Sequence, residues 1–262
     1  MPSLASSPSV LPPISPSDTA LFLDFDGTLA DIAPRPEAVQ VAPALIELLQ
    51  ELAERLDGAL AIVSGRRLAD LDHFLAPLQL PAAAEHGALR RLASGRLTEP
   101  RPPDLRYATV VAEELMRHYP GLRMERKTSA VALHYRQRPS LEQTCLDAMT
   151  EACDRTPGTE LLRGKCVVEL KLLGVNKGQA MACFMKEAPF AGRQPWFAGD
   201  DLTDETGFVW VQQAGGAAIK VGQGSTAALH RCDSPAGLRQ WLAHSLLAMR
   251  QAAPGLSRAG PA

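Results

Sequence analysis

Two aspartates, Asp24 and Asp26, stand one residue apart at the end of an apolar run, in the segment LFLDFDGTL. The run is typical of a buried strand, and Gly27 indicates a sharp turn directly after it. A carboxylate in such a place loses hydration, so two of them together require a chemical explanation. We expect both to act on one phosphate group. Asp24 would attack phosphorus and form an acyl phosphate, and Asp26 would exchange protons with the leaving oxygen and then with water.

Three more polar clusters accompany predicted core elements: SGR at 64–66, NKG at 176–178 and GDDLTDE at 199–205. Each cluster alone is an ordinary turn or helix-cap pattern. Together they stand where the carboxyl ends of parallel strands meet, and this coincidence predicts a single site.

The carboxylates of this predicted site indicate a magnesium ion. Asp24, Asp26 and Asp200 offer hard oxygen ligands, which Mg²⁺ prefers, and without a cation they would repel one another. A transferring phosphoryl group also needs donors around its own oxygens. Two hydroxyls and an ammonium would supply them, from Thr28, Ser64 and Lys177.

Unbroken apolar segments alternate with amphipathic segments around these clusters. This alternation predicts an α/β core with a parallel sheet covered on both faces. Strands are expected at 20–25, 59–66, 80–92, 195–200 and 217–222, and helices at 42–58, 68–75, 176–188, 202–214 and 235–249.

The sequence pattern changes after the prolines at positions 100, 102 and 103. Its pattern predicts helix 108–121, strand 129–138, helix 140–153 and strand 165–173, a small inserted α+β domain. The expected organisation is a tail at 1–18, a core in two parts at 19–103 and 174–249, a cap at 104–173 and a second tail at 250–262.

Composition excludes several classes of protein. The 262 residues carry a formal net charge of -2, which offers no general attraction for nucleic acid or for an anionic membrane. No apolar segment is long enough to span a bilayer, and the Pro- and Ser-rich beginning lacks the pattern of a signal peptide. Five scattered cysteines favour a reducing cytoplasm over a disulfide framework. The oligomeric state stays open, with a monomer as the working expectation.

The motifs DFDGTL, VSGR, NKG and GDDLTDE resemble the four motifs of the haloacid dehalogenase (HAD) superfamily of phosphohydrolases. Within it, AEHGA, LHYR, VVELK and GDDLTDE resemble the trehalose-6-phosphate phosphatase family, from about Leu21 to Trp241. This resemblance implies a Rossmann-like core and a mobile cap. It also implies Mg²⁺-dependent hydrolysis of trehalose 6-phosphate, a small-molecule sugar phosphate, through a phosphoaspartate.

The resemblance further implies roles for particular residues. Mg²⁺ would be held by Asp24, the main-chain carbonyl of Asp26 and Asp200, with Asp201 or Asp204 nearby. Ser64 and Lys177 would bind phosphate. The residues expected to contact the rest of the substrate are Gly65, Arg66, Glu85, His86, Lys127, Glu169 and Lys171.

Other functions fit some of these observations. The core chemistry serves any ester, so sucrose 6-phosphate or a mannosyl phosphate are alternative substrates, and only the cap can discriminate. A phosphoacceptor switch also uses acidic residues, Mg²⁺, a hydroxyl and a lysine. Against a switch, Asp26 supplies an acid/base that a long-lived phosphoaspartate should avoid, and the large insert would have no purpose. A sugar-phosphate-binding protein without activity is disfavoured because no expected catalytic position is missing.

Overall fold

Strand β1, Thr19–Leu23, lies inside the central sheet of the computed structural model, which describes residues 11–99 and 101–252. All of its residues are buried, because parallel strands flank it on both sides. These neighbours are β10, Gln194–Gly199, and β2, Leu60–Val63. The end of β1 therefore brings Asp24 to the middle of the carboxyl edge of the sheet.

The central sheet has eight strands among the described residues, in the order β12-β11-β10-β1-β2-β3-β4-β5. The strands from β12 to β3 are parallel, and β4 and β5 extend the sheet as antiparallel strands. The bounds of the outer strands are β3 Ala82–Ala84, β4 Leu89–Arg91, β5 Leu97–Thr98, β11 Ala217–Val221 and β12 His230–Cys232.

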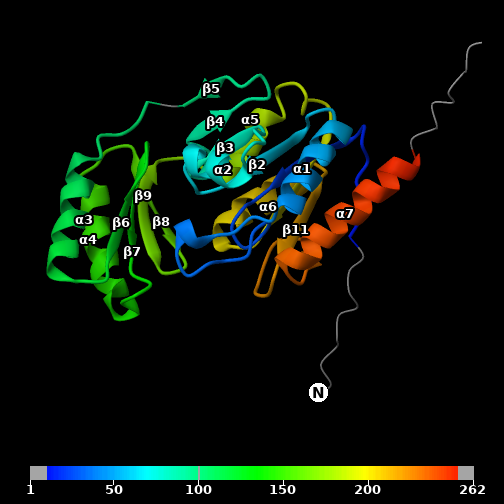
Figure 1. Cartoon of the computed structure of the whole chain (residues 1–262). Helices are drawn as coiled ribbons and strands as arrows, with labels where there is room; N and C mark the ends of the chain where they lie inside the picture. The colour runs from blue at the N-terminus through cyan, green and yellow to red at the C-terminus, as the bar shows by residue number, and fades with distance from the viewer. Residues whose placement is uncertain (1–10, 100, 253–262) are drawn as a thin grey trace, which may run out of the picture.

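Helices cover both faces of this sheet (Figure 1). Their bounds are α1 Pro43–Arg55, α2 Leu68–Leu75, α5 Lys177–Phe184, α6 Glu205–Gln213 and α7 Pro235–Ala252. Helix α1 packs against α7, and α5 packs against α6. From the central β1–β10 pair, the chain proceeds outward to β2 on one side of the sheet and to β11 on the other. Because both crossovers are right-handed, α1 and α6 lie on opposite faces of the sheet.

The cap has its own sheet and its own hydrophobic core. Its four strands are antiparallel in the order β6-β7-β9-β8, with bounds Arg123–Arg126, Ala130–His134, Val167–Leu172 and Thr159–Gly164. Helices α3, Arg106–His118, and α4, Glu142–Asp154, lie on the side of this sheet away from the central domain (Figure 1). The other face of the cap sheet is thereby left to look toward the carboxyl edge of the core.

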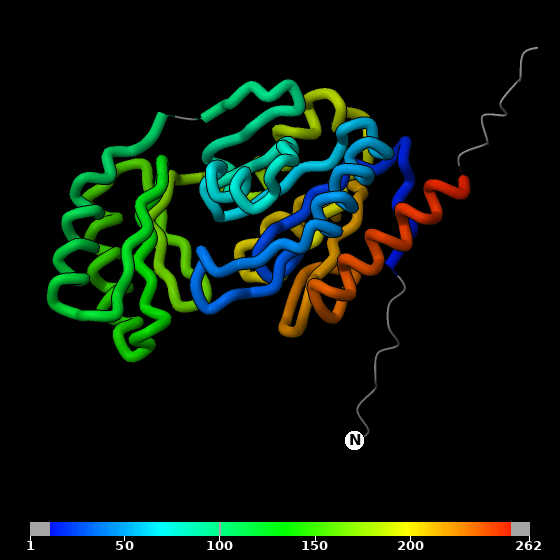
Figure 2. Tube along the Cα trace, viewed as in Figure 1, coloured from blue at the N-terminus to red at the C-terminus, as the bar shows by residue number. Residues whose placement is uncertain are grey.

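The core loop at 31–39 also reaches the cap, as the blue segment beside the green and yellow-green cap in Figure 2 shows. Arg123 of the cap lies 3.5 Å from Glu37, and Arg136 donates to the Ala33 carbonyl at 3.3 Å. This loop is therefore a contact between cap and core on the side away from β4 and β5.

The predicted fold class, a Rossmann-like parallel core with a smaller inserted α+β domain, is confirmed. One strand prediction was wrong, because 80–92 is not a single strand. It contains β3, a turn at Glu85–Gly87 and the antiparallel β4. The cap also contains β6 and β8, and the core contains β12, which the apolar pattern did not indicate.

The predicted tails fall largely outside the described residues, namely at 1–10 and 253–262. Within the described part, Ile14 is buried in the core, and the Pro16 carbonyl accepts a hydrogen bond from Arg193. At the other end α7 continues to Ala252. The packed part of the chain therefore starts before residue 19 and continues past residue 249. No helix among residues 11–99 and 101–252 has the length and apolar character needed to cross a membrane.

Candidate active site

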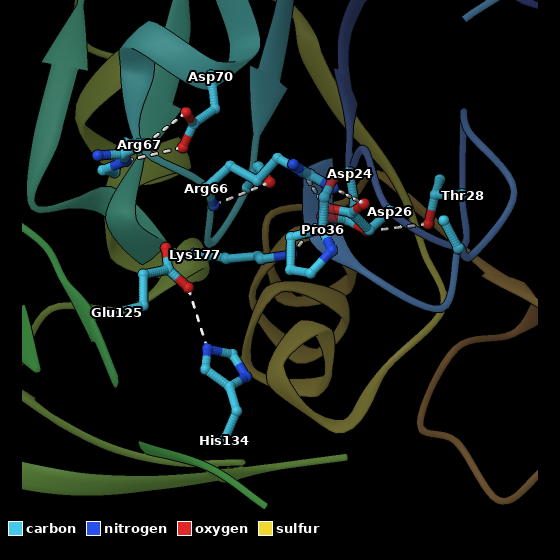
Figure 3. A network of polar contacts seen from close by, with 12 residues as sticks. Asp24, Asp26, Thr28, Pro36, Arg66, Arg67, Asp70, Glu125, His134 and Lys177 are labelled. Carbon is cyan, nitrogen blue, oxygen red and sulfur yellow. Dashed lines mark hydrogen bonds and ion pairs between the residues drawn. The ribbon is translucent and has the colours of Figure 1, made fainter. Parts of the chain in front are cut away.

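Asp24, the expected nucleophile, lies directly after β1 with only 4% of its surface exposed. Both of its carboxylate oxygens have partners, as Figure 3 shows. The Thr28 hydroxyl donates to Oδ2 at 3.1 Å, and the Lys177 ammonium donates to Oδ1 at 2.7 Å. Since Thr28 is fully buried, its hydroxyl orients Asp24.

Lys177 links two carboxylates in this interior. It is the first residue of α5, whose start is capped by the Asn176 side chain accepting from the Gln179 N–H at 2.9 Å. Its ammonium donates to Asp204 Oδ1 at 2.6 Å as well as to Asp24. The NKG motif therefore delivers a fixed positive charge between the strand ends of β1 and β10.

Asp204 is completely buried, and its two oxygens already accept three hydrogen bonds. Besides the bond from Lys177, its Oδ2 accepts the N–H groups of Asp200 and Asp201, each at 2.9 Å. The Asp201 side chain in turn accepts the Leu202 N–H at 2.7 Å. This capping box makes Asp204 a support for the loop that carries Asp200.

Asp24, Asp200 and Asp204 offer oxygen atoms that lie within 4.8 Å of one another. Close approach is possible because residue 27 is glycine: a Cβ there would lie 2.1 Å from Asp200 Oδ2, and its φ is +74°. The Lys220 ammonium, which the sequence reasoning missed, donates to the Asp200 carbonyl and, at 2.9 Å, to the Val221 carbonyl.

The electrostatics of this cluster show an excess of negative charge. Burial, together with the charges of Asp204 and Asp201, raises the pKa of Asp200 to about 7. Burial raises the pKa of Asp24 well above its usual range, although the Lys177 ammonium opposes the shift. Burial alone would lower the pKa of Lys177, but Asp204 and Asp24 outweigh it and raise that pKa. A divalent cation with a preference for oxygen ligands fits this donor set.

Asp26 points away from that cluster and pairs with Arg66 of the SGR motif (Figure 3). Arg66 Nε and Nη2 each lie 2.6 Å from one carboxylate oxygen of Asp26. Arg66 Nη2 also donates to the Pro36 carbonyl at 2.9 Å, and the guanidinium stacks over Phe74 at 4.7 Å from the ring centroid. The side chains of Asp24 and Asp26 thus have separate environments, as the turn at Gly27 predicts.

The other two residues of the SGR motif lie at the same carboxyl edge of the central sheet. Ser64 is buried after β2, and its hydroxyl accepts the Arg66 N–H at 3.2 Å. Gly65 packs on His86, since a Cβ at Gly65 would lie 2.5 Å from the imidazole ring. Burial lowers the pKa of His86, although Glu169 works in the opposite direction.

On the cap side, Lys127 and Glu169 form a buried ion pair of 2.7 Å. His86 Nε2 lies 3.8 Å from the same Glu169 oxygen. Burial alone would raise the pKa of Glu169, but Lys127 and His86 outweigh it and lower that pKa. Oε1 of Glu169 is buried without a hydrogen-bond partner among the described residues, which suits a group that receives a ligand hydroxyl.

The expected sugar contacts Glu85 and Lys171 do not line the cavity between core and cap. The Glu85 carboxylate accepts the N–H groups of Thr128 and Ser129, both at 3.1 Å. The Lys171 ammonium is bonded to Glu160 and to the Val175 carbonyl. The resemblance predicted substrate contacts at both positions, but their charged groups are directed into the protein.

The cavity itself has a volume of about 670 Å³, within the range of small-molecule sites. Of the expected site residues, the cavity is lined by Asp24, Asp26, Gly65, Arg66, His86, Lys127, Glu169, Lys177, Asp200 and Asp201. The core supplies the acidic groups and the groups expected to bind phosphate, and the cap covers them with groups that suit hydroxyl recognition.

Cap residues outside the predicted site also line this cavity, among them Glu125, His134, Arg136 and Lys165. Glu125 Oε2 and His134 Nε2 lie 3.1 Å apart across β6 and β7 (Figure 3). The sequence offered no signal for Glu125, because β6, the strand that carries it, was not recognisable from the apolar pattern.

A family model for trehalose-phosphatase matches residues 22–234 of the chain. Among curated proteins, trehalose-6-phosphate phosphatase of Escherichia coli (strain K12) is 43% identical over 234 residues. That alignment covers 88% of this chain and 88% of the bacterial protein.

Solved structures agree with this similarity. The crystal structure of a trehalose-6-phosphate phosphatase related protein is 30% identical with a TM-score of 0.70, over 88% of this chain and 98% of that one. A phosphatase of the HAD superfamily from Bacteroides thetaiotaomicron is 19% identical with a TM-score of 0.57, over 91% and 99%. The second likeness concerns the fold alone.

Proposed function

The chain belongs to the trehalose-phosphatase family of phosphoric monoester hydrolases, and from that premise we propose that it hydrolyses trehalose 6-phosphate to trehalose and phosphate, with Mg²⁺ and a phosphoaspartate on Asp24. The observation that carries the proposal is that four motifs meet at one end of a cavity. The cap closes the other side of this cavity and places a buried Lys127–Glu169 ion pair there. We further propose that this cap comprises residues 104–173.

Asp24, Asp200 and the main-chain carbonyl of Asp26 would hold the Mg²⁺ ion. When bound, the ion offsets the crowded carboxylate charge and polarises the phosphoryl oxygens. Asp204 would act behind these ligands, because its oxygens are already engaged by Lys177 and two N–H groups. Asp201 supports the same loop as the N-cap residue of the short helix Leu202–Asp204.

Asp24 attacks the phosphorus atom, and the bond between phosphorus and the sugar oxygen breaks. Thr28 and Lys177 hold the carboxylate of Asp24 in one orientation, which lowers the entropic part of the barrier. The Lys177 ammonium and the Ser64 hydroxyl then stabilise charge on the phosphoryl oxygens. The product of this step is trehalose and an acyl phosphate on Asp24.

Asp26 gives its proton to the departing sugar oxygen. It then takes a proton from the water that attacks the acyl phosphate, and phosphate leaves with Asp24 restored. Arg66 occupies both carboxylate oxygens of Asp26, so this ion pair must open before Asp26 can reach the sugar oxygen. We propose that Arg66 turns to the phosphate oxygens when the ester binds, since both side chains line the cavity.

The cap would select the disaccharide. Lys127 and Glu169 are buried, and the free Oε1 of Glu169 is an acceptor for a sugar hydroxyl. A substrate lacking that hydroxyl would leave the oxygen unpaired, which is a strong basis for discrimination.

A cytoplasmic location is supported by the cysteines, all five of which are free. A monomer remains our expectation and is tested by sedimentation.

The test is phosphate release from trehalose 6-phosphate, compared with sucrose 6-phosphate, a mannosyl phosphate and glucose 6-phosphate, each with Mg²⁺ and with a chelator. We expect preference for trehalose 6-phosphate and loss of release with the chelator. Preference for another ester would overturn the substrate assignment alone. A stable phosphoprotein without turnover would favour a phosphoacceptor switch.

A further inference from the structure

Glu85 connects the core to the cap through a buried carboxylate. It follows β3 in the core and is 3% exposed. Its Oε1 accepts the Thr128 N–H and its Oε2 accepts the Ser129 N–H, both at 3.1 Å. Thr128 and Ser129 belong to the turn between β6 and β7 of the cap, so one core side chain holds two main-chain groups of the other domain.

The backbone at Glu85 is in an unusual conformation for this purpose. Glu85 has φ +50° and His86 has φ +57°, two successive left-handed residues that are not glycine. Such a conformation is strained for residues that carry a Cβ and persists only where its surroundings enforce it. Here the Glu85 N–H donates to the Arg66 carbonyl at 2.8 Å, and the His86 N–H donates to the Ser64 carbonyl at 2.9 Å. The phosphate-binding SGR loop thus fixes the direction of Glu85.

The cap turn that Glu85 holds also carries Lys127. The Lys127 N–H closes this turn by donating to the Ala130 carbonyl at 2.9 Å, and its ammonium pairs with Glu169 in the cavity. The Ser129 carbonyl accepts the Leu172 N–H at 3.2 Å, which ties the same turn to the end of β9. The position of the turn therefore sets the position of the Lys127–Glu169 pair relative to the core.

Apart from the bond of Lys171 to the Val175 carbonyl at the chain link, the other polar side-chain contacts between core and cap are longer or more exposed. His86 lies 3.8 Å from Glu169, and Arg123 lies 3.5 Å from Glu37 with both side chains more than half exposed, at 53% and 63%. A carboxylate that accepts two N–H groups away from water makes stronger, charge-assisted bonds. Away from the chain link at 172–175, where Lys171 bonds to the Val175 carbonyl, Glu85 is therefore the firmest polar attachment of the cap to the core among the described residues.

We propose that Glu85 is a positioning residue that latches the cap turn 127–129 onto the phosphate-binding edge and so sets the Lys127–Glu169 pair over the bound sugar. The expected effect on hydrolysis of the disaccharide phosphate rests on the proposed function, whereas the contact between Glu85 and the cap turn does not. A disaccharide phosphate needs the latched cap. A small aryl phosphate engages the core loops alone and does not.

The latch is tested by hydrogen exchange at the Thr128 and Ser129 amides in the wild-type chain, in Glu85→Ala and in the isosteric Glu85→Gln. Glu187→Gln is the matched control, because its carboxylate pairs with Arg90 within the core. Alanine should raise exchange at both amides about tenfold or more, as expected when a charge-assisted bond is lost. Glutamine, which keeps one acceptor oxygen, should give an intermediate increase, and the control should give none.

The second readout is kcat/KM on trehalose 6-phosphate and on p-nitrophenyl phosphate. We expect Glu85→Gln to reduce the value for the disaccharide about tenfold and to leave the aryl ester within about threefold, because only the former uses cap contacts. Unchanged exchange at both amides in the folded variants would overturn the latch. Equal losses on both esters would show that Glu85 serves the phosphate chemistry directly, and would also overturn it. If trehalose 6-phosphate is not a substrate, the exchange experiment still decides.

Discussion

The guanidinium of Arg66 contacts both carboxylate oxygens of Asp26, with each nitrogen 2.6 Å from its oxygen. Arg66 is itself held by the Pro36 carbonyl and by stacking on Phe74. The residue proposed to move protons is therefore kept beside a cation that also lines the phosphate cavity. This relationship makes Arg66 a partner in the proposed proton transfer as well as a proposed phosphate contact.

Replacing Arg66 by lysine should reduce kcat for trehalose 6-phosphate about tenfold or more, because a lysine keeps the charge but cannot make the two-nitrogen contact. Steady-state kinetics provide the measurement. Arg250→Lys is the control, since Arg250 makes the same two-nitrogen contact to Glu51 on an exposed surface. An unchanged kcat in Arg66→Lys would contradict the role.

Asp24→Asn should reduce turnover by a factor of about 10³ or more, because an amide oxygen is a poor nucleophile toward phosphorus. Acid quenching of the wild-type enzyme with labelled ester should trap label on the protein, and the variant should trap none. Asp18→Asn, near the start of β1, controls for loss of a carboxylate outside the site. Retained turnover in the Asp24→Asn variant would refute the nucleophile assignment.

The raised pKa of Asp200 predicts how stability depends on pH and Mg²⁺. In the folded, metal-free protein this pKa is about 7, against 3.8 for an ordinary aspartate, because burial and Asp204 disfavour the charge. A folded-state pKa above the unfolded value gives stability that is complete below about pH 4 and is lost as pH rises through 7. The melting temperature without metal should therefore fall between pH 5 and pH 8.

Added Mg²⁺ should restore this loss at pH 8, since the ion binds the charged carboxylates of the folded state. Asp200→Asn should flatten the pH dependence and abolish the Mg²⁺ effect on the melting temperature. Asp147→Asn, on exposed α4, is the control. A melting temperature that rises with pH in the metal-free wild type would show that this site does not govern stability.

Glu169→Gln should lower kcat/KM for trehalose 6-phosphate about tenfold while sparing p-nitrophenyl phosphate, because the role proposed for the cap pair is to contact the sugar and not the phosphate. The change also leaves the buried Lys127 ammonium without its charged partner, so the free energy of unfolding should fall. Glu151→Gln is the matched control, because Glu151 pairs with Arg155 on the exposed side of α4. Equal losses on the two esters would argue against a role in sugar selection.

The sequence carried enough information to predict the central strands and to place the four polar motifs at one edge of the sheet. Strands β1, β2, β10 and β11 are buried and therefore largely apolar, so each was recognisable. The missed strands are edges of their sheets. β6, with the sequence RMER, lies at the edge of the cap sheet and is only partly buried, so it shows no apolar alternation.

The role of Glu85 could not be predicted, because it depends on a left-handed turn formed by residues that rarely adopt that conformation. The pattern AAAEHGAL suggests a continuing strand, yet Glu85 and His86 turn the chain and separate β3 from β4. Lys220 was missed for a related reason. Its ammonium, in a buried strand, is satisfied partly by the Asp200 carbonyl, which only the fold brings close.

The pairing of β10 with β1 also determines when the core sheet and its site can assemble during translation. Asp24 emerges early from the ribosome, but Lys177 and Asp200 are translated only after the whole cap. The cap strands β6 and β7 pair with close sequence neighbours, as do β8 and β9, whereas β1 must wait with one edge unpaired until β10 arrives. A nascent chain can thus complete the cap first, whereas a product that ends before residue 194 lacks β10 and leaves one edge of the central strand β1 open to aggregation.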